Sequence, residues 1–278
     1  MFETNHDRFM TDQGKRKMTM SQKDPNDHLA QIERFMVDAL GNVNPDEDGG
    51  QRLIERRDEF VTYVMAGISR FTAKLPDFTL AREILGDDFI SPQEITAARG
   101  LTYSAEQVTE LERTLPNQET LEWLKCNDYY LVAGSPREMS LLDVRELERS
   151  YFFSKEGGWY ANETVAFAKS EKVTCRWYML RKGIVPNSTS KTWSEQQGLL
   201  SNIETTPTAV ELAWGMTVYK AVRGVYLLGS VYARTSSVDS YGDHVIVGYF
   251  AGDGLVVDVW RVSDRSGNVG VSSSQKAS

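Results

Sequence analysis

The chain contains few of the residues that build metal and redox centres. Its 278 residues include two cysteines and three histidines. Cys126 and Cys175 form no C-x-x-C pair, which fits a reducing compartment or simple burial and leaves a disulfide between them unsupported. His6, His28 and His244 are too dispersed for a metal cluster. We therefore expect no metal ion and no other cofactor.

Long apolar runs and concentrated positive charge are also missing. No segment approaches the roughly 18 apolar residues of a membrane span, and the first 20 residues lack the apolar core of a signal peptide. The 31 Lys and Arg residues are dispersed, and 39 Asp and Glu residues bring the net charge to −8. This pattern argues against binding to nucleic acid or anionic membranes. We expect a soluble protein without membrane insertion, cytoplasmic by default; display on a cell or phage surface stays open.

No group of residues has the spacing of a catalytic site. The glycines at 252–254 do not lie between a strand and a helix, as those of a phosphate-binding loop do. The acidic loop at 41–50 lacks the alternating ligands of a calcium loop. Asp143, Glu146 and Glu148 fall on a predicted helix, where exposed or paired charges are usual. We therefore predict that the protein is not an enzyme.

The hydrophobic pattern divides the chain into three parts. Residues 1–27 are polar and charged, which predicts a disordered leader. Residues 28–124 have a helical period, with capping boxes that begin at Ser91 and Ser104, and form a predicted helical N-terminal region. Residues 125–278 combine strands and helices. The predicted fold class is α+β: a helical N-terminal region followed by a domain of mixed, mainly antiparallel strands with two helices.

Within the last part, capping residues and turn residues predict where the elements begin. A short helix is predicted after Ser140, and two more open at Thr192, with its capping box, and at Thr206-Pro207, where proline suits the first helical position. Apolar and β-branched runs predict the strands, which are 129–133, 225–233, 244–250, 255–261 and 268–274, and a further strand within TCRWYMLRKGIV at 174–185.

The 54 residues from Ala221 to Ser274, near the C-terminus, contain no Lys, Glu, Gln or Met. These types make up 52 of the 278 residues, so uniform usage would place about ten of them there. A β-rich composition explains part of the deficit, because strands favour Val and Tyr and turns favour Asp and Gly. It explains the loss of Lys less well, since lysine is common on exposed edge strands. Codons that end in a pyrimidine encode none of these four residue types, nor Trp. A segment in which Asn-type AAY codons had been mutated would therefore lack Lys, Glu, Gln and Met.

Three short stretches resemble motifs of a known family. TPTAVELAWG at 206–215 resembles an L-P-T-x-A-E-W helix start, with Leu212 where Trp is common. YARTSSVDS at 232–240 takes the place of a strand-to-loop W-S-S-T stretch, and DRSGNVG at 264–270 resembles a closing N-R-N-N-N-x-G-F-R, with Val-Ser in place of Phe-Arg. Over residues 125–274 the chain resembles the variable target proteins of diversity-generating retroelements, in which a reverse transcriptase with adenine-directed errors rewrites the 3′ end of one gene.

The resemblance implies a C-type-lectin-type fold, related to the formylglycine-generating-enzyme fold, with a variable segment at about 237–272. Strand alternation predicts that one parity of this segment is framework: Val245, Val247, Phe250, Leu255, Val257, Trp260 and Val269, with turns at Gly242, Gly248, Gly254 and Gly270. The other parity, with the turn residues, is the predicted ligand face: Tyr241, His244, Ile246, Tyr249, Asp253, Asp258, Arg261, Val262, Ser263 and Ser266. Tyr and Arg there are typical of binding hot spots, and the alternative for each position is an ordinary exposed strand residue.

Three functions are compatible with these observations. The first is a non-enzymatic binding protein that displays a diversified surface to an unknown protein or other macromolecular ligand. The second is an enzyme of the formylglycine-generating type, although Cys126 and Cys175 lie outside the C-terminal segment where its copper-binding cysteines would be expected. The third is a structural or assembly protein, with the helical N-terminal region forming a homo-oligomer or docking to a larger body.

Overall fold

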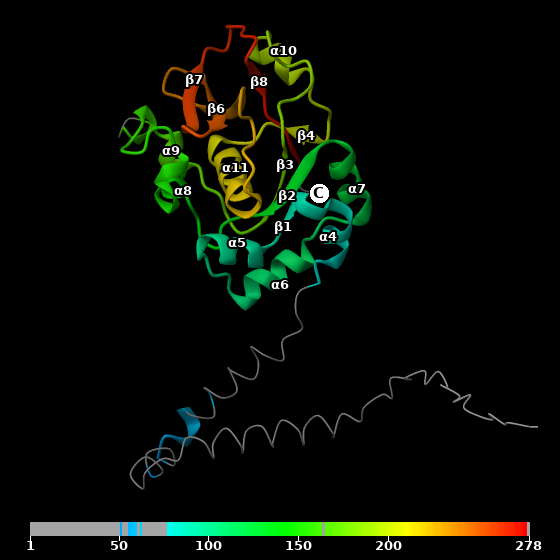
Figure 1. Ribbon diagram of the computed structural model, residues 1–278, viewed down its shortest axis with the longest axis vertical. Helices are drawn as coiled ribbons and strands as arrows, with labels where there is room; N and C mark the ends of the chain where they lie inside the picture. The colour runs from blue at the N-terminus through cyan, green and yellow to red at the C-terminus, as the bar shows by residue number, and fades with distance from the viewer. Residues whose placement is uncertain (1–50, 52–54, 60–61, 63–76, 163–164, 277–278) are drawn as a thin grey trace, which may run out of the picture. The chain divides into compact units, whose positions relative to one another are not determined.

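A computed structural model describes residues 77–162 and 165–276, together with residues 51, 55–59 and 62. The chain divides into two compact units, Met1–Lys74 and Leu75–Ser278. In the first unit, the described residues 55 and 57–59 are helical, and Arg56 forms an exposed salt bridge with Glu59. The leader predicted at 1–27 and residues 28–50 of the predicted helical N-terminal region lie outside the described residues. The following paragraphs concern the second unit (Figure 1).

The second unit opens with four short helices around a two-residue strand. They are α4 (Thr79–Leu85), α5 (Pro92–Arg99), α6 (Ala105–Arg113) and α7 (Gln118–Cys126), with a 3-10 turn η1 (Gly86–Asp88) and β1 (Phe89–Ile90) after α4. The predicted capping boxes at Ser91 and Ser104 are confirmed, since each side chain accepts from the backbone three residues on. These helices pack in the same compact unit as the later strands, so this unit includes residues that we assigned to the helical N-terminal region.

The first sheet contains five strands in the order β1-β2-β3-β9-β4. Besides β1 they are β2 (Tyr129–Ala133), β3 (Trp177–Arg181), β4 (Glu204–Thr205) and β9 (Ser274–Gln275). β1 pairs with β2 in parallel, and the other pairs are antiparallel. Every residue of β2 is buried, because helices cover the sheet. β9 lies between β3 and β4 and pairs with both, so residues 274–275 are part of the first sheet.

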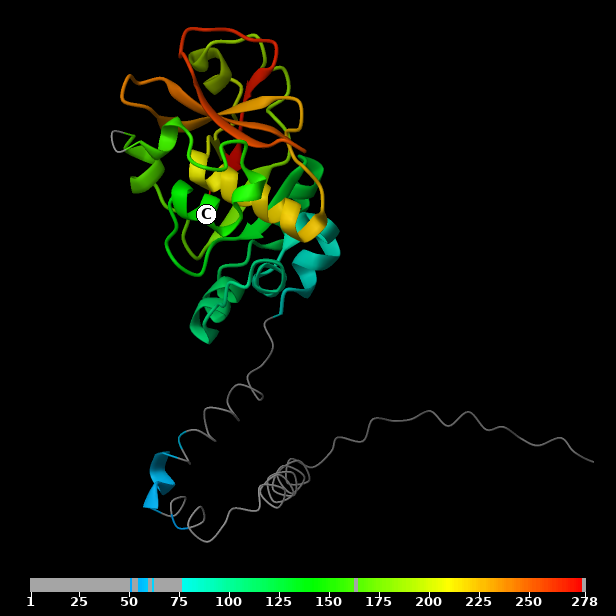
Figure 2. The same cartoon turned by 60° about the vertical axis from the view of Figure 1, so that its left-hand side comes forward.

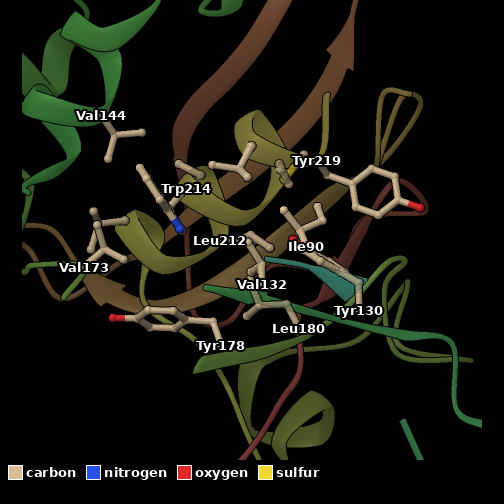
Figure 3. Close-up of a cluster of buried hydrophobic side chains, with 14 of the residues drawn as sticks. Ile90, Tyr130, Val132, Val144, Val173, Tyr178, Leu180, Leu212, Trp214 and Tyr219 are labelled. Atoms are coloured by element: carbon tan, nitrogen blue, oxygen red, sulfur yellow. The ribbon is translucent and has the colours of Figure 1, made fainter. Parts of the chain in front are cut away.

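Helix α11 (Ala209–Arg223) lies between the two sheets and supplies the centre of the core. Leu212 and Trp214 of this helix lie over Val132 and Leu180 of the first sheet (Figure 3). The helix begins later than predicted: Thr208, not Thr206, is the N-cap, and its side chain accepts from Glu211 N. The predicted helix start at Thr206-Pro207 is therefore wrong by two residues, because the capping box is completed by Glu211 rather than by proline at the first position.

Other short helices lie between the strands. They are α8 (Leu141–Leu147), η2 (Arg149–Tyr151), η3 (Trp159–Ala161), α9 (Phe167–Ser170) and α10 (Trp193–Gln197). The predicted starts of α8 at Ser140 and of α10 at Thr192 are confirmed. No helix of the described residues is long and apolar enough to cross a membrane.

The second sheet contains β5 (Tyr232–Val238), β6 (His244–Ala251), β7 (Gly254–Trp260) and β8 (Val269–Val271), in the order β7-β6-β5-β8. It lies at the end of the unit opposite α5 and α6 (Figure 2). The strand predicted at 225–233 is wrong in position. The backbone of Leu228 lies in the left-handed region (φ 52°), which interrupts an extended strand, and β5 begins only at Tyr232. The α+β class with two mainly antiparallel sheets is confirmed.

Gly215 sets how closely α11 can approach the first sheet. A Cβ atom at this position would collide with the Tyr130 hydroxyl and with the side chain of Leu180. We expect Gly215→Ala to lower the free energy of unfolding by about 1–3 kcal/mol through overpacking, measured by urea denaturation. Gly198→Ala is the matched control, because a Cβ there meets its nearest atom at 3.5 Å; an equal loss in both variants contradicts the packing account.

Glu94 joins α5 to α4 and α11 through charge-assisted hydrogen bonds. Arg82 and Arg223 lie 2.7 and 2.8 Å from its two carboxylate oxygens, and Ser91 N donates to one of them. Burial opposes ionisation, but the hydrogen bonds outweigh it and lower the pKa of Glu94 from 4.5 to about 2.

Because the folded-state pKa of Glu94 is depressed, its contribution to stability is present above pH 4.5 and is lost as the pH falls towards 2. We expect Glu94→Gln to be less stable than the native protein at pH 7 and the difference to vanish near pH 2, measured by denaturant unfolding at each pH. Glu83→Gln on the exposed side of α4 is the control; a pH-independent difference for Glu94→Gln contradicts the assignment.

Candidate binding surface on the second sheet

The two faces of the second sheet have different surroundings. Ala233, Val247 and Val257 lie in one row across β5, β6 and β7, and all three belong to the main hydrophobic core. The neighbouring row contains Arg234 and Ile246, which point to the opposite face. We call this opposite side the outer face. Two segments from other parts of the chain cover much of it.

Arg234 holds both covering segments. Its side chain is fully buried, with a relative exposure of 0%. Nη1 donates to the Lys191 carbonyl (3.1 Å) and to Gln196 Oε1 (2.9 Å). Nη2 donates to the carbonyls of Arg261 (2.8 Å) and Asp264 (2.7 Å). Burial lowers the pKa of Arg234 from its usual value, yet four acceptors surround the guanidinium in place of water.

Gln196 extends this network to β8. Its Nε2 atom donates to the carbonyls of Ser188 (2.8 Å) and Val269 (3.2 Å) while Oε1 accepts from Arg234. The buried amide is therefore fully used, and residues 188–196 are attached to both the edge strand and the buried arginine.

The same cover buries two residues that we predicted on the ligand face. His244 is 8% exposed, and its ring stacks on Trp193 with centroids 3.6 Å apart. Nδ1 of His244 bonds the Thr235 carbonyl, and burial lowers the pKa of the imidazole. Ile246 is 2% exposed beside Arg234. Solvent exposure of these two side chains was a wrong prediction, since residues 188–196 return over this part of the sheet.

The loop of residues 261–268, here called the outer loop, is held through its main chain. In addition to the two carbonyls bound by Arg234, the Val262 carbonyl accepts from Trp193 N (3.0 Å) and the Ser266 carbonyl accepts from Ser190 N (2.7 Å). The Asn268 carbonyl accepts from Tyr232 N (2.8 Å). Every one of these donors lies outside the loop, and every acceptor is a backbone atom. These five contacts do not depend on the side chains of the loop, whereas Arg265 adds a side-chain attachment to the Ser190 carbonyl and to Glu195.

The side chains of the outer loop accordingly face solvent. Arg261, Val262 and Ser263 are exposed, and Ser266 is half-buried, where its hydroxyl bonds the Asn268 side chain. Val262 is 42% exposed. These four predicted positions therefore have the solvent access that a binding surface needs.

A bulge in β6 places Tyr249 on the outer face. Gly248 cannot carry a side chain, because a Cβ there would collide with the Val231 carbonyl oxygen. At Tyr249 the backbone enters the left-handed region (φ 47°), and the register with β7 shifts between Gly248 and Ala251. The bulge reverses the alternation of side chains: Phe250 is fully buried, and Tyr249 is 38% exposed with its ring 4.5 Å from that of Tyr232.

Tyr241 occupies the tip of the β5–β6 hairpin at the other end of the sheet. It is 89% exposed. The turn beneath it is fixed by Asp239, whose Oδ1 accepts from Tyr241 N and Asp243 N, both at 2.9 Å, and by Gly242 (φ 83°). Asp243 Oδ1 in turn accepts from Val262 N (3.4 Å), so the hairpin tip touches the outer loop.

The structure thus brings the predicted residues together in two groups. Tyr241, Arg261, Val262 and Ser263 lie around the hairpin tip and the start of the outer loop. Tyr249, Asp258 and Ser266 surround Tyr232 and Asn268 at the end of the outer loop. Asp253 is exposed in the β6–β7 turn, apart from both groups.

The predicted framework residues Val245, Val247, Phe250, Leu255, Val257 and Val269 are buried, and Trp260 is half-buried. The residues that sequence reasoning missed are Tyr232 and Asn268 in the second group, and Arg234, Gln196 and Trp193 beneath the outer loop. The first two are brought into place by strand pairing, and the last three by segments far apart in the sequence. The arginine within an otherwise apolar or hydroxylated strand, YARTSSV, is the signal that could have suggested a buried clamp.

Features that would indicate catalysis elsewhere are weak. The described residues contain no group of three or more His, Cys, Asp or Glu side chains that could hold a metal ion. Both cysteines are free. A cavity of about 430 Å³ lies between α6, α7 and β3, beside Cys175, whose thiol pKa is raised by burial and by Glu110. A raised pKa disfavours the thiolate that a nucleophilic cysteine requires.

No family model, no curated protein and no solved structure matches the chain. The function of this surface is therefore inferred from its geometry.

Replacing Arg234 should release the outer loop. Arg234→Leu takes the guanidinium donors from four acceptors, of which the Arg261 carbonyl keeps Asp264 N as a donor, and we expect the free energy of unfolding to fall by about 3 kcal/mol. Arg234→Lys keeps the charge but cannot reach all four acceptors, so a smaller loss is expected. Denaturant unfolding measures both losses, and hydrogen exchange follows the amides of residues 261–268.

The matched control is Arg261→Ala with Ser263→Ala, which removes exposed loop side chains and should change stability by less than about 0.5 kcal/mol. If the arginine variants lose no more stability than this control and the loop amides exchange at the native rate, the clamp is not what holds the loop.

Proposed function

We propose that this is a non-enzymatic binding protein whose C-terminal segment, at about 237–272, is diversified by retroelement mutagenesis on a C-type-lectin-type scaffold. One observation carries the proposal: the outer loop is fastened by its carbonyl groups to donors that lie outside it. A surface built in this way accepts many side chains without losing its shape. A variable binding loop needs a constant backbone shape, because a diversified binding surface combines a rigid backbone with side chains that change.

The identity of the exposed residues supports the proposal. Tyr241, Tyr249, Asp253, Asp258 and the outer-loop residues all belong to the set that pyrimidine-ending codons encode. Tyr, Asp and Ser follow from an Asn-type AAY codon by replacing a single adenine. Tyrosine is also the side chain that supplies the most contact area for the least conformational entropy at binding surfaces.

The arrangement of the elements supports the scaffold part of the proposal. Residues 206–215, which carry the clearest resemblance to the family, form the capped start of α11 at the centre of the core. The mixed, mainly antiparallel strands around this helix are those expected of the implied fold. The stretch at 264–270 falls in the outer loop and the start of β8, where the resemblance would place the end of the variable segment.

Deep sequencing of the last ~150 nucleotides of the gene in its natural population, with the flanking few kilobases, tests the proposal. We expect substitutions at the codons of the exposed residues Tyr241, Tyr249, Asp258 and Arg261–Ser263. We also expect a near-identical repeat and a reverse-transcriptase gene nearby.

The buried residues Val245, Val247 and Phe250 of the same segment are the internal control, because side-chain changes there disturb the core. A uniform 3′ end, or substitutions spread equally over buried and exposed codons, would falsify diversification.

A further inference from the structure

The second group of exposed residues combines aromatic rings with an unpaired acid. We call Tyr232, Tyr249, Asp258 and Asn268 the aromatic–acid cluster. They come from β5, β6, β7 and the outer loop, so four separate segments contribute one side chain each. We propose that this cluster binds an arginine side chain of a partner protein segment. The inference rests on the proposed function and names the chemistry of its ligand.

Strand pairing aligns Tyr232 with β7. Tyr232 pairs with Gly248, and Gly248 pairs with Val256 on the next strand. Gly248 has no side chain, and the β5 backbone at Val231 and Tyr232 fills the place that a Cβ atom there would take, so no β6 side chain separates Tyr232 from β7 in this row. Asp258 is two residues along β7 from Val256 and therefore points to the same face. Burial, the charge of Asp258 and Tyr249 together raise the pKa of Tyr232, as their proximity requires.

The two rings are held in place before any ligand arrives. They lie 4.5 Å apart and are tilted by 35°. The bulge fixes the backbone of Tyr249, with its N–H bonded to the Val231 carbonyl (3.0 Å), and Asn268 Nδ2 donates to its hydroxyl (3.4 Å). Tyr249 remains 38% exposed and Tyr232 is half-buried. The two rings therefore lose little conformational entropy when a planar cation stacks on them.

The carboxylate of Asp258 is available to that cation. It is exposed, and Oδ1 accepts from Val259 N (2.9 Å). Within residues 77–162 and 165–276 no Lys or Arg forms a salt bridge with it. Arg234 is buried on carbonyl groups and Arg265 pairs with Glu195, while the exposed Arg261 forms no salt bridge within the described residues. Residues 221–274 contain no lysine at all.

These features match a guanidinium group better than other ligands. A guanidinium stacks on tyrosine faces and donates two parallel hydrogen bonds to a carboxylate, whereas an ammonium group offers no plane to stack. An anionic ligand would face the unpaired Asp258. The net charge of −8 also attracts basic partners over longer distances. An arginine on a partner protein is thus the occupant that shape and charge favour.

The cluster also fits the proposed diversification. Tyr249, Asp258 and Asn268 correspond to the codons TAY, GAY and AAY, which differ only in the first base. Their combination is therefore a property of this variant of the chain, and other variants would bind other groups at the same place.

The test uses the full chain, labelled with ¹³C in its tyrosine rings, and two nonapeptides at low ionic strength: Ac-(Gly-Arg)4-Gly-NH2 and its citrulline analogue, which has the same shape without the charge. We expect the arginine peptide to shift the ring signals of Tyr232 and Tyr249 and the citrulline peptide to leave them unchanged. Asp258→Asn should weaken binding about two- to fivefold, and Tyr249→Leu should do so by a similar factor.

Asp253→Asn is the matched control, since it removes an exposed acid outside the cluster, and it should bind as the native chain does. The inference is overturned by the absence of arginine-peptide binding, by equal binding of the citrulline peptide, or by equal weakening in Asp253→Asn and Asp258→Asn, which indicates general charge attraction. None of these results contradicts the proposed function, which population sequencing tests separately. Conversely, a uniform 3′ end together with cluster-specific arginine binding would overturn diversification and support the arginine site.

Discussion

The guanidinium of Arg234 is the interaction on which the outer face of the second sheet depends. A buried charge without a carboxylate partner is costly unless its donors are satisfied. Here four oxygens from two remote segments accept from Nη1 and Nη2, while Nε has no partner. The acceptors depend on the arginine in turn, because removing it takes a donor from each of them. Residues 188–196 and the outer loop are thereby fastened to β5 and to each other. Trp193 and Gln196 then close the space over His244 and Val269.

This fastening separates the shape of the surface from its chemistry. The outer loop contributes main-chain acceptors, whose positions are the same for nearly every residue type, while its side chains project into solvent. At the hairpin tip Asp239 has a similar role, since it bonds the backbone N–H of Tyr241 and leaves the ring free. A protein that must present changing side chains on a constant frame benefits from such a division, because the entropy of ordering the loop is lost on folding rather than on binding. The proposed binding function follows from this division.

The bulge at Tyr249 shows a second way in which backbone geometry selects a surface residue. Close approach of β5 excludes any side chain at position 248, and the left-handed conformation of the next residue turns its ring outwards. A non-glycine residue in this conformation stores about 1 kcal/mol or more of strain, which the buried Phe250 and its ring contacts with Tyr151 and Tyr226 offset. The exposed pair of tyrosines beside Asp258 is a product of this local reversal.

The sequence by itself determined the α+β class, the starts of α5, α6, α8 and α10, and the burial of Val245 and Val247, because capping boxes and strand alternation are local properties of the chain. The absence of Lys, Glu, Gln and Met from residues 221–274 is likewise visible in the sequence alone. Tertiary structure decided which residues of that segment reach solvent. His244 and Ile246 have the spacing of exposed residues, yet they are covered by a segment some 50 residues earlier in the chain, and Tyr232 and Asn268 join the candidate surface through pairing across strands. Strand alternation predicts to which face of a sheet a side chain points. Whether protein or water covers that face depends on the packing of remote segments, which the buried Arg234 directs here.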